Sequence, residues 1–467
     1  MATPIPGTRP SAPPALAPER PVVWPRRTQR RLANGLQVVL VESHTIPKFT
    51  AQLLFRSGNA AVAQENPGLA EMTAAVVRTG TSARSSRQIE EDLRRMGADV
   101  STTAGADSSA ISISGLAEFS EGLLALVAEL AREASFPAEE LERERRQKLE
   151  EVRLERATPG FLAGERLRKV LFGGHPYSVV SPTEEQVGAY TREQLVAYYR
   201  KHYTPANALL VAAGDFSAEA LFAQIEKILG AWQGALPEPE TRPEPPQLRG
   251  RRVYLVHLPE TVQTQLLVGN LAITRRHPDW LRLSLANSIF GGAFNSRLVI
   301  NIREQKGYTY SPRSSVHALR QHGYFSVHAA VRNDVTAATL AETFYELDRI
   351  RALPVGEDEL ADARNYLSGI FSLGLATRDG LVGQLATTYF HELPEDYLET
   401  YREKIRALTA DDVLDAARKD FDSANAQIVV MGDAQQVGAQ AALFGEVESY
   451  DAQGNRCSWQ VAGDRSL

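Results

Sequence analysis

The sequence is poor in the residues that build disulfide frameworks, redox motifs and membrane spans. Cys457 is the only cysteine among 467 residues, which excludes an internal disulfide and any Cys-x-x-Cys metal or redox site. No apolar run reaches the roughly 18 residues that a membrane span needs, and no charged start leads into an apolar signal core. The net charge of −6 predicts neither a nucleic-acid nor a membrane partner.

The catalytic signatures of common enzymes are missing as well. The chain has no Gly-x-Ser-x-Gly, no phosphate-binding glycine loop and no His-Glu-x-x-His. No two of the nine histidines stand four residues apart, the spacing that would place both on one helical face. His317, His322 and His328 are the closest three, on a stretch typical of strand and turn. Surface or sheet histidines are therefore a better interpretation than a metal site.

The most informative feature that is present is an internal repeat. Its length is that of a duplicated domain, and the chain is long enough for two domains of roughly 200 residues. Residues that match at one constant offset are Thr191 and Thr409, Asn207 and Asn425, and Gly214 and Gly432. Further upstream, two short stretches match at almost the same offset: Glu140-Leu141 with Glu359-Leu360, and Ala157-Thr158 with Ala376-Thr377.

Proline content sets the predicted boundaries of these two domains. Residues 1–28 hold eight prolines and are expected to form a disordered tail, because such a segment buries too little to fold. Residues 234–250 hold five prolines among charged residues and are predicted to be the linker. The N-terminal domain is then 29–233 and the C-terminal domain 251–467.

Each half is expected to have an α+β fold. Strand patterns cover residues 36–42, 49–55 and 110–114 in the first half, and a further strand begins at residue 265 in the second. Phe119, Leu123 and Leu130 lie on one apolar helical stripe, and a long charged helix is predicted from about residue 137 to 157.

Two further segments carry chemistry-related patterns. One is Asn66–Thr81, Asn-Pro-Gly-Leu-Ala-Glu-Met-Thr-Ala-Ala-Val-Val-Arg-Thr-Gly-Thr; the other, Phe290–Tyr310, has paired glycines, Ser-Arg-Leu and then Arg-Glu-x-x-Gly-x-x-Tyr. With the duplication, they make the chain resemble the pitrilysin/insulinase-type zinc peptidases (inverzincins), in particular subunits related to mitochondrial processing peptidase. The resemblance implies two homologous domains, each a mostly antiparallel sheet covered by helices, in a processing-peptidase-like metallopeptidase fold.

In the first segment the resemblance implies a degenerate zinc site. Active members carry Gly-x-Ala-His-x-x-Glu-His, and an ungapped alignment places the first histidine on Glu71, the general-base glutamate on Ala74 and the second histidine on Ala75. The third ligand of the family is a glutamate on the following long helix, where this chain has Glu151. A methyl group cannot ligate zinc or accept a proton, so no metal is expected in this chain. Glu151 is interpreted as solvated or salt-bridged; alternatively, Glu71 and Glu151 face each other and hold some cation.

In the second segment Arg303 and Tyr310 occupy positions that, in the family, hold the substrate's backbone carbonyl beside the scissile bond. A guanidinium and a phenol are donors that stabilise negative charge on a carbonyl oxygen. The structural alternative is that Arg303 pairs with a helix carboxylate while Tyr310 packs at the end of a strand.

The resemblance therefore implies a non-catalytic, substrate-binding subunit of a heterodimeric zinc metallopeptidase. The expected partners are a peptide and a homologous zinc-bearing subunit that supplies the metal, and Arg303 and Tyr310 would act there in trans. The alternative is a peptidase-fold scaffold or peptide-binding protein with no role in proteolysis; an autonomous peptidase with an aberrant site is disfavoured. The proline-rich start suits an exported protein whose signal was trimmed, so a soluble protein of the bacterial periplasm is favoured over a cytoplasmic one.

Overall fold

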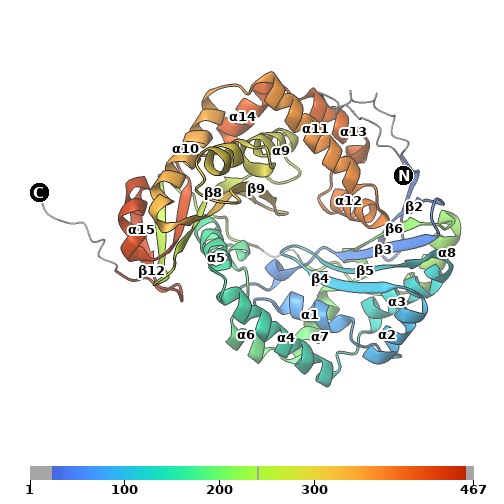
Figure 1. The fold of residues 1–467 in the computed structure, drawn as a ribbon. Coiled ribbons are helices and arrows are strands. Elements are labelled where there is room, and N and C mark those ends of the chain that lie inside the picture. Colours follow the sequence, from blue (N-terminus) through green and yellow to red (C-terminus); the bar gives the residue numbers. More distant parts are fainter. Residues whose placement is uncertain (1–23, 239–240, 459–467) are drawn as a thin grey trace, which may run out of the picture.

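The computed structural model describes residues 24–238 and 241–458, and two six-stranded sheets dominate it (Figure 1). The first sheet has the order β1 (Arg27–Arg31), β2 (Gln37–Glu42), β6 (Ala208–Gly214), β3 (Lys48–Phe55), β5 (Ser109–Leu116) and β4 (Asp99–Ala104). The second has the order β12 (Glu446–Tyr450), β7 (Arg252–His257), β11 (Gln427–Gly432), β8 (Gln263–Ala272), β10 (Gly323–Arg332) and β9 (Arg313–Ala318).

The two sheets repeat one topology over five of their six strands. The strand order β2-β6-β3-β5-β4 of the first sheet corresponds to β7-β11-β8-β10-β9 of the second. In each set only the first pair is parallel and the other three are antiparallel. The sixth strands differ, since β1 lies antiparallel to β2 whereas β12 lies parallel to β7. The predicted α+β class with mostly antiparallel sheets is confirmed.

Helices cover both sheets. Those that precede the linker are α1 (Leu69–Val77), α2 (Ser86–Arg95), α3 (Ser120–Glu133), α4 (Ala138–Arg156), α5 (Pro159–Phe172), α6 (Glu184–Ala189), α7 (Arg192–His202) and α8 (Ala218–Leu229). Those that follow it are α9 (Trp280–Asn287), α10 (Thr336–Ala352), α11 (Glu357–Gly374), α12 (Arg378–Phe390), α13 (Tyr397–Ala407), α14 (Ala410–Asp420) and α15 (Ala434–Ala441). None of the helices within the described ranges combines the length and apolarity that crossing a bilayer requires.

The predicted end of the proline-rich tail at residue 28 is wrong. β1 already begins at Arg27, which pairs with Val41, and Thr28 pairs with Leu40. Trp24 also packs against a buried cluster. The proline-rich composition hid this strand, whose pairing with β2 gives it the partner that a tail would lack. Residues 1–23 of the predicted tail lie outside the described residues.

Both faces of the first sheet are buried at its central strands β2, β6 and β3, which explains why β2 is an almost continuous apolar run. Val38 and Leu40 point into the core formed with α1, α3, α7 and α8. Val39 and Val41 point to the opposite face, because successive strand side chains alternate. A strand with one solvated face would instead alternate apolar and polar residues.

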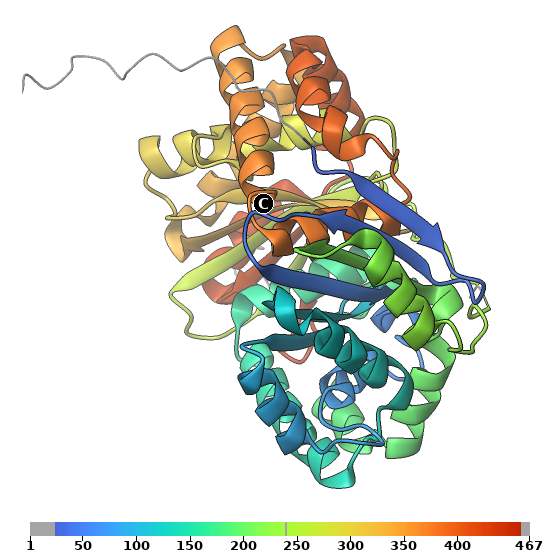
Figure 2. The ribbon, with the colours of Figure 1, turned by 90° about the vertical axis from the view of Figure 1, so that its right-hand side faces the viewer.

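Each half supplies a helix that covers the sheet of the other half. α5 packs on β8 and β11 of the second sheet, and α12 packs on β6 and β3 of the first (Figures 1 and 2). The two helices are equivalent in the repeat, because they follow the matched residues Thr158 and Thr377. Gly269 on β8 lets α5 lie close, since an added Cβ would stand 3.0 Å from a methyl carbon of Leu167 and 2.7 Å from the carbonyl oxygen of Phe325. The exchange ties the halves into one body.

We predict that Leu167→Ala in α5 and Leu385→Ala in α12 each lower the free energy of unfolding by about 2–4 kcal/mol. Both side chains are buried between a helix of one half and the sheet of the other. The measurement is urea unfolding followed by circular dichroism. Leu154→Ala and Leu373→Ala are matched controls, because these leucines occupy equivalent exposed positions of the repeat and should change stability by no more than about 0.5 kcal/mol. If the two buried leucines and the two exposed leucines lost the same stability on substitution, α5 and α12 would not be the contacts that hold the halves together.

Candidate functional site

The position of the family's first zinc-binding histidine holds a carboxylate that is already engaged. Glu71 lies in the first turn of α1. The helix begins directly after Gly68, whose φ of 79° is one that favours glycine. The Glu71 carboxylate accepts a hydrogen bond from Asn59 Nδ2 at 2.6 Å and another from Lys148 Nζ at 2.9 Å. Asn59 comes from a short 3₁₀ turn (Asn59–Ala61) and Lys148 from α4.

Lys148 stands between the two carboxylates of the degenerate site. Its Nζ also lies 3.5 Å from Glu151 Oε2, one turn further along α4. The lysine side chain is 16% exposed. Burial disfavours its charged form, but the carboxylates of Glu71, Glu151 and Glu155 outweigh burial and raise the pKa of Lys148. A cation does lie between Glu71 and Glu151, and it is the chain's own ammonium group.

The remaining residues of this site do not fit zinc. Ala74 is buried in the core and Ala75 is half-buried, and neither has a donor atom. The two carboxylates that could ligate a metal both pair with Lys148, whose ammonium would repel a divalent ion. Across residues 24–238 and 241–458, no group of three or more His, Cys, Asp or Glu side chains converges in a way that could hold a metal. The donor set therefore supports no zinc chemistry on this chain.

Arg303 and Tyr310 lie side by side on the second half. Arg303 belongs to a π-helical segment (Val299–Gln305), and its Cζ lies 4.5 Å from the ring centroid of Tyr310 and 4.9 Å from that of Phe294. The guanidinium is thus held between two aromatic rings, while its Nε lies 3.2 Å from Glu304. Tyr310 is 80% exposed, so it is not packed against the end of a strand. The pairing with Glu304 is of the kind that the structural alternative predicted for Arg303.

The histidine trio does not converge. His317 on β9 stacks on Tyr324 with ring centroids 4.2 Å apart, and His328 on β10 lies 3.1 Å from Gln265 Oε1. His322 instead faces Glu244 of the linker, at 3.6 Å. The trio thus consists of two sheet histidines and one turn histidine, each with its own neighbour.

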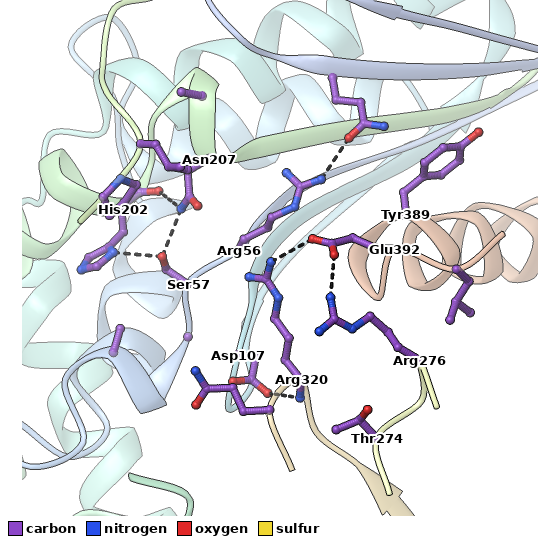
Figure 3. A pocket seen from close by; sticks show the side chains of 18 of the residues that line it. Arg56, Ser57, Asp107, His202, Asn207, Thr274, Arg276, Arg320, Tyr389 and Glu392 are labelled. Atoms are coloured by element: carbon purple, nitrogen blue, oxygen red, sulfur yellow. Dashed lines mark hydrogen bonds and ion pairs between the residues drawn. The ribbon is translucent and has the colours of Figure 1, made fainter. Parts of the chain in front are cut away.

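A cavity of about 1300 Å³ between the two halves is a candidate site that the sequence did not predict. Figure 3 shows part of its wall, where Arg56, Arg276, Arg320 and Glu392 lie together. These residues are far apart in the sequence and belong to no motif. The one sequence feature that could have pointed to this cavity is Arg56, a charged residue directly after the apolar strand β3.

Comparison with known proteins decides the family. The model described as "Insulinase (Peptidase family M16)" matches residues 37–177, which include the degenerate zinc site. The model described as "Peptidase M16 inactive domain" matches residues 189–367, which include Arg303 and Tyr310. The chain belongs to peptidase family M16. The inferred resemblance to pitrilysin/insulinase-type peptidases is confirmed.

Relatives and solved structures of this M16 chain agree with that assignment. The uncharacterized zinc protease YmxG of Bacillus subtilis is 24% identical over 345 residues, covering 73% of this chain and 83% of the relative. An uncharacterized zinc protease of Rickettsia felis is 22% identical over 406 residues, covering 86% and 96%. A crystal structure described as a peptidase M16 inactive domain from Pseudomonas fluorescens superposes with a TM-score of 0.81 at 29% identity, over 87% of this chain and 98% of that one. The inactive-domain description of the Pseudomonas structure and of the model over residues 189–367, together with the donor set around Glu71, indicates a non-catalytic, peptidase-like M16 scaffold.

We predict that Lys148→Met lowers the free energy of unfolding by about 1–3 kcal/mol, because it leaves the Glu71 carboxylate without its cation. Adding Glu71→Gln to Lys148→Met should recover much of the loss. Urea unfolding at neutral pH is the measurement, and Arg87→Met, which breaks the exposed Arg87–Glu91 pair, is the matched control with an expected change below about 0.5 kcal/mol. A Lys148→Met variant as stable as the control would show that the ion pair contributes nothing.

We also predict that the protein loses stability as the pH falls from about 6.5 to about 4. Burial, reinforced by nearby cations, lowers the pKa of four histidines to about 4: His202, His317, His328 and His391. In the unfolded chain a histidine titrates near 6.5, so below that pH the unfolded state takes up more protons than the folded state. Urea midpoints measured across this window should fall, and less steeply in His202→Gln. An unchanged slope in that variant would contradict the assignment.

Proposed function

We propose that this chain is the substrate-binding subunit of a heterodimeric zinc metallopeptidase, whose partner is a homologous subunit that carries the zinc. The observation that carries the proposal is an asymmetry between the two motif sites. The metal positions are filled by alanines and a lysine-centred ion pair, whereas Arg303 and Tyr310 remain together with Tyr310 open to solvent. Because the carbonyl-binding pair is accessible while the chain has no set of zinc ligands, a second chain would have to supply the metal for peptide hydrolysis.

The geometry of the pair supports a role in holding a peptide carbonyl. Stacking between Phe294 and Tyr310 restricts the rotamers of Arg303, so less entropy is lost when its N–H groups bind an oxygen. The phenol of Tyr310 makes no hydrogen bond to the described part of the chain, so it is available to donate to a ligand. In the complex, the two donors would stabilise the charge that develops on the scissile carbonyl while the partner's zinc activates water.

An extended peptide could be held beside this pair by strand addition. β9 is an edge strand of the second sheet, and it begins at Arg313, shortly after Tyr310. An edge strand offers unpaired main-chain N–H and C=O groups that bind a peptide backbone with little sequence preference. The names of the relatives support peptide substrates, since the proteins of B. subtilis and R. felis are described as zinc proteases.

We predict that Arg303→Ala lowers the kcat of the two-chain complex about a hundredfold or more, and that Tyr310→Phe lowers it less, because each change removes a donor at the developing charge. Peptide hydrolysis by the reconstituted complex is the measurement, with assembly checked by gel filtration. Matched controls are Arg332→Ala, at the exposed end of β10, and Tyr345→Phe, on the exposed face of α10. Unchanged rates in intact complexes of Arg303→Ala and Tyr310→Phe would overturn the role and favour a scaffold.

A further inference from the structure

The cavity between the halves is distinct from both motif sites, since neither Lys148 nor Arg303 lines it. Its floor in the first half is formed where β2 and β6 begin and β3 ends, because Gln37 pairs with Leu209 and Phe55 with Ala208. The second half closes it with the β9–β10 turn, which carries Arg320, and with the C-terminal end of α12. The volume of about 1300 Å³ is large enough for several residues of a peptide.

Most arginines on the cavity wall are neutralised by carboxylates. Arg276 and Arg320 both contact Glu392, at 2.7 and 3.4 Å, and Figure 3 shows the two guanidinium groups converging on that carboxylate. The other pairs on the wall are Arg242 with Asp107, at 3.7 Å, and Arg30 with Glu219. These cations therefore have most of their charge compensated within the chain.

Arg56 and Arg31 also line the cavity and form no ion pair within the described residues, and of the two only Arg56 is half-buried. Its Nη2 donates to Gln37 Oε1 at 3.0 Å, a neutral acceptor, and its backbone N–H donates to Asn207 O at 3.1 Å, which fixes the residue at the end of β3. Burial, together with the charges of Arg320 and Arg31, lowers the pKa of Arg56, and the Glu392 carboxylate offsets only part of this effect. A half-buried cation beside like charges is costly unless an anion joins it.

The charges around the cavity restrict the kind of anion. Carboxylates of Asp107, Glu238, Glu392 and Glu395 also line it, and they would repel a polyphosphate or another multiply charged ligand. A ligand with a single carboxylate and an ammonium or basic side chains fits better, because its carboxylate can meet an arginine of the wall and its cations can meet the wall's carboxylates. A guanidinium binds a carboxylate through two parallel, charge-assisted hydrogen bonds. Gln37 accepts a hydrogen bond from Nη2 of Arg56 only, so other N–H groups of the guanidinium are left to bind a carboxylate.

We propose that this cavity binds a peptide by its C-terminal carboxylate, with Arg56 as the anchoring residue and Gln37 as the residue that positions it. This inference rests on the proposed function only in taking peptides as the ligand class. It concerns a separate surface of the same chain, one that needs neither zinc nor a second subunit. A cleavage product or a short peptide could thus be retained by its newly exposed end.

The test is calorimetric binding of a short lysine–alanine peptide to the isolated chain, with the free C-terminus and with the same peptide amidated. The free acid should bind at least about tenfold more tightly than the amide. Arg56→Gln should abolish that difference, whereas Arg332→Gln, at an exposed ion pair outside the cavity, should keep it. Without peptide, Arg56→Gln should melt no lower than the unsubstituted chain, because it removes an uncompensated charge.

Four results would overturn the inference, three of them from binding and one from thermal stability. The first is equal binding of acid and amide, and the second is a preference for the acid that survives Arg56→Gln. The third is inorganic phosphate that competes as well as the peptide, which would identify a site for free oxyanions. A lower melting temperature of Arg56→Gln with unchanged peptide binding would assign Arg56 to the fold alone. None of these results depends on the activity of a two-chain complex, so the failure of this inference and the failure of the proposed function can be told apart.

Discussion

The exchange of one helix between the halves is the contact on which the rest of the molecule depends. α5 buries Leu167, Leu171 and Phe172 against the second sheet, and α12 buries Leu385 and other apolar residues against the first. Because each sheet has both faces covered only when the other half is in place, the halves cannot separate without exposing a large apolar area. The cavity, the strand ends at Arg56 and the β9–β10 turn take their relative positions from this packing.

The charges around Lys148 are arranged so that carboxylates from two helices share one cation. Glu71 on α1 and Glu151 on α4 both lie beside the ammonium group of Lys148, which also belongs to α4. Lys148 thereby gives both Glu71 and Glu151 a cationic neighbour between α1 and α4. The proposed chemistry of this chain therefore rests on Arg303 and Tyr310 of the other half, where Tyr310 is exposed.

The sequence predicted much of the fold because strand and helix periodicities are local. The predicted long charged helix, from about 137 to 157, is α4, and the repeat foretold the two related sheets. The sequence could not predict which sheet α5 and α12 cover, because an apolar helical face does not specify the sheet against which it packs. β1 was missed because proline content outweighed a short strand whose stability comes from pairing with β2.

The candidate sites were accessible to sequence reasoning to different degrees. The contact of Arg303 with Tyr310 follows a family pattern, and Lys148 stands one helical turn before Glu151, a spacing that indicates an ion pair. The cavity around Arg56 is formed by segments hundreds of residues apart, such as β3 and the end of α12. No local sequence pattern predicts that such distant segments lie together.

In the function proposed for this chain, it completes the catalytic site of a zinc-bearing homologue. Reconstitution tests it most directly: the peptidase rate of the zinc-bearing homologous subunit is measured alone, with this chain added in increasing amounts, and with this chain alone. We expect negligible rates for either chain by itself and, when they are mixed, a rate that rises to a plateau at one copy of each. A zinc-bearing subunit that is fully active alone, and indifferent to this chain, would contradict it.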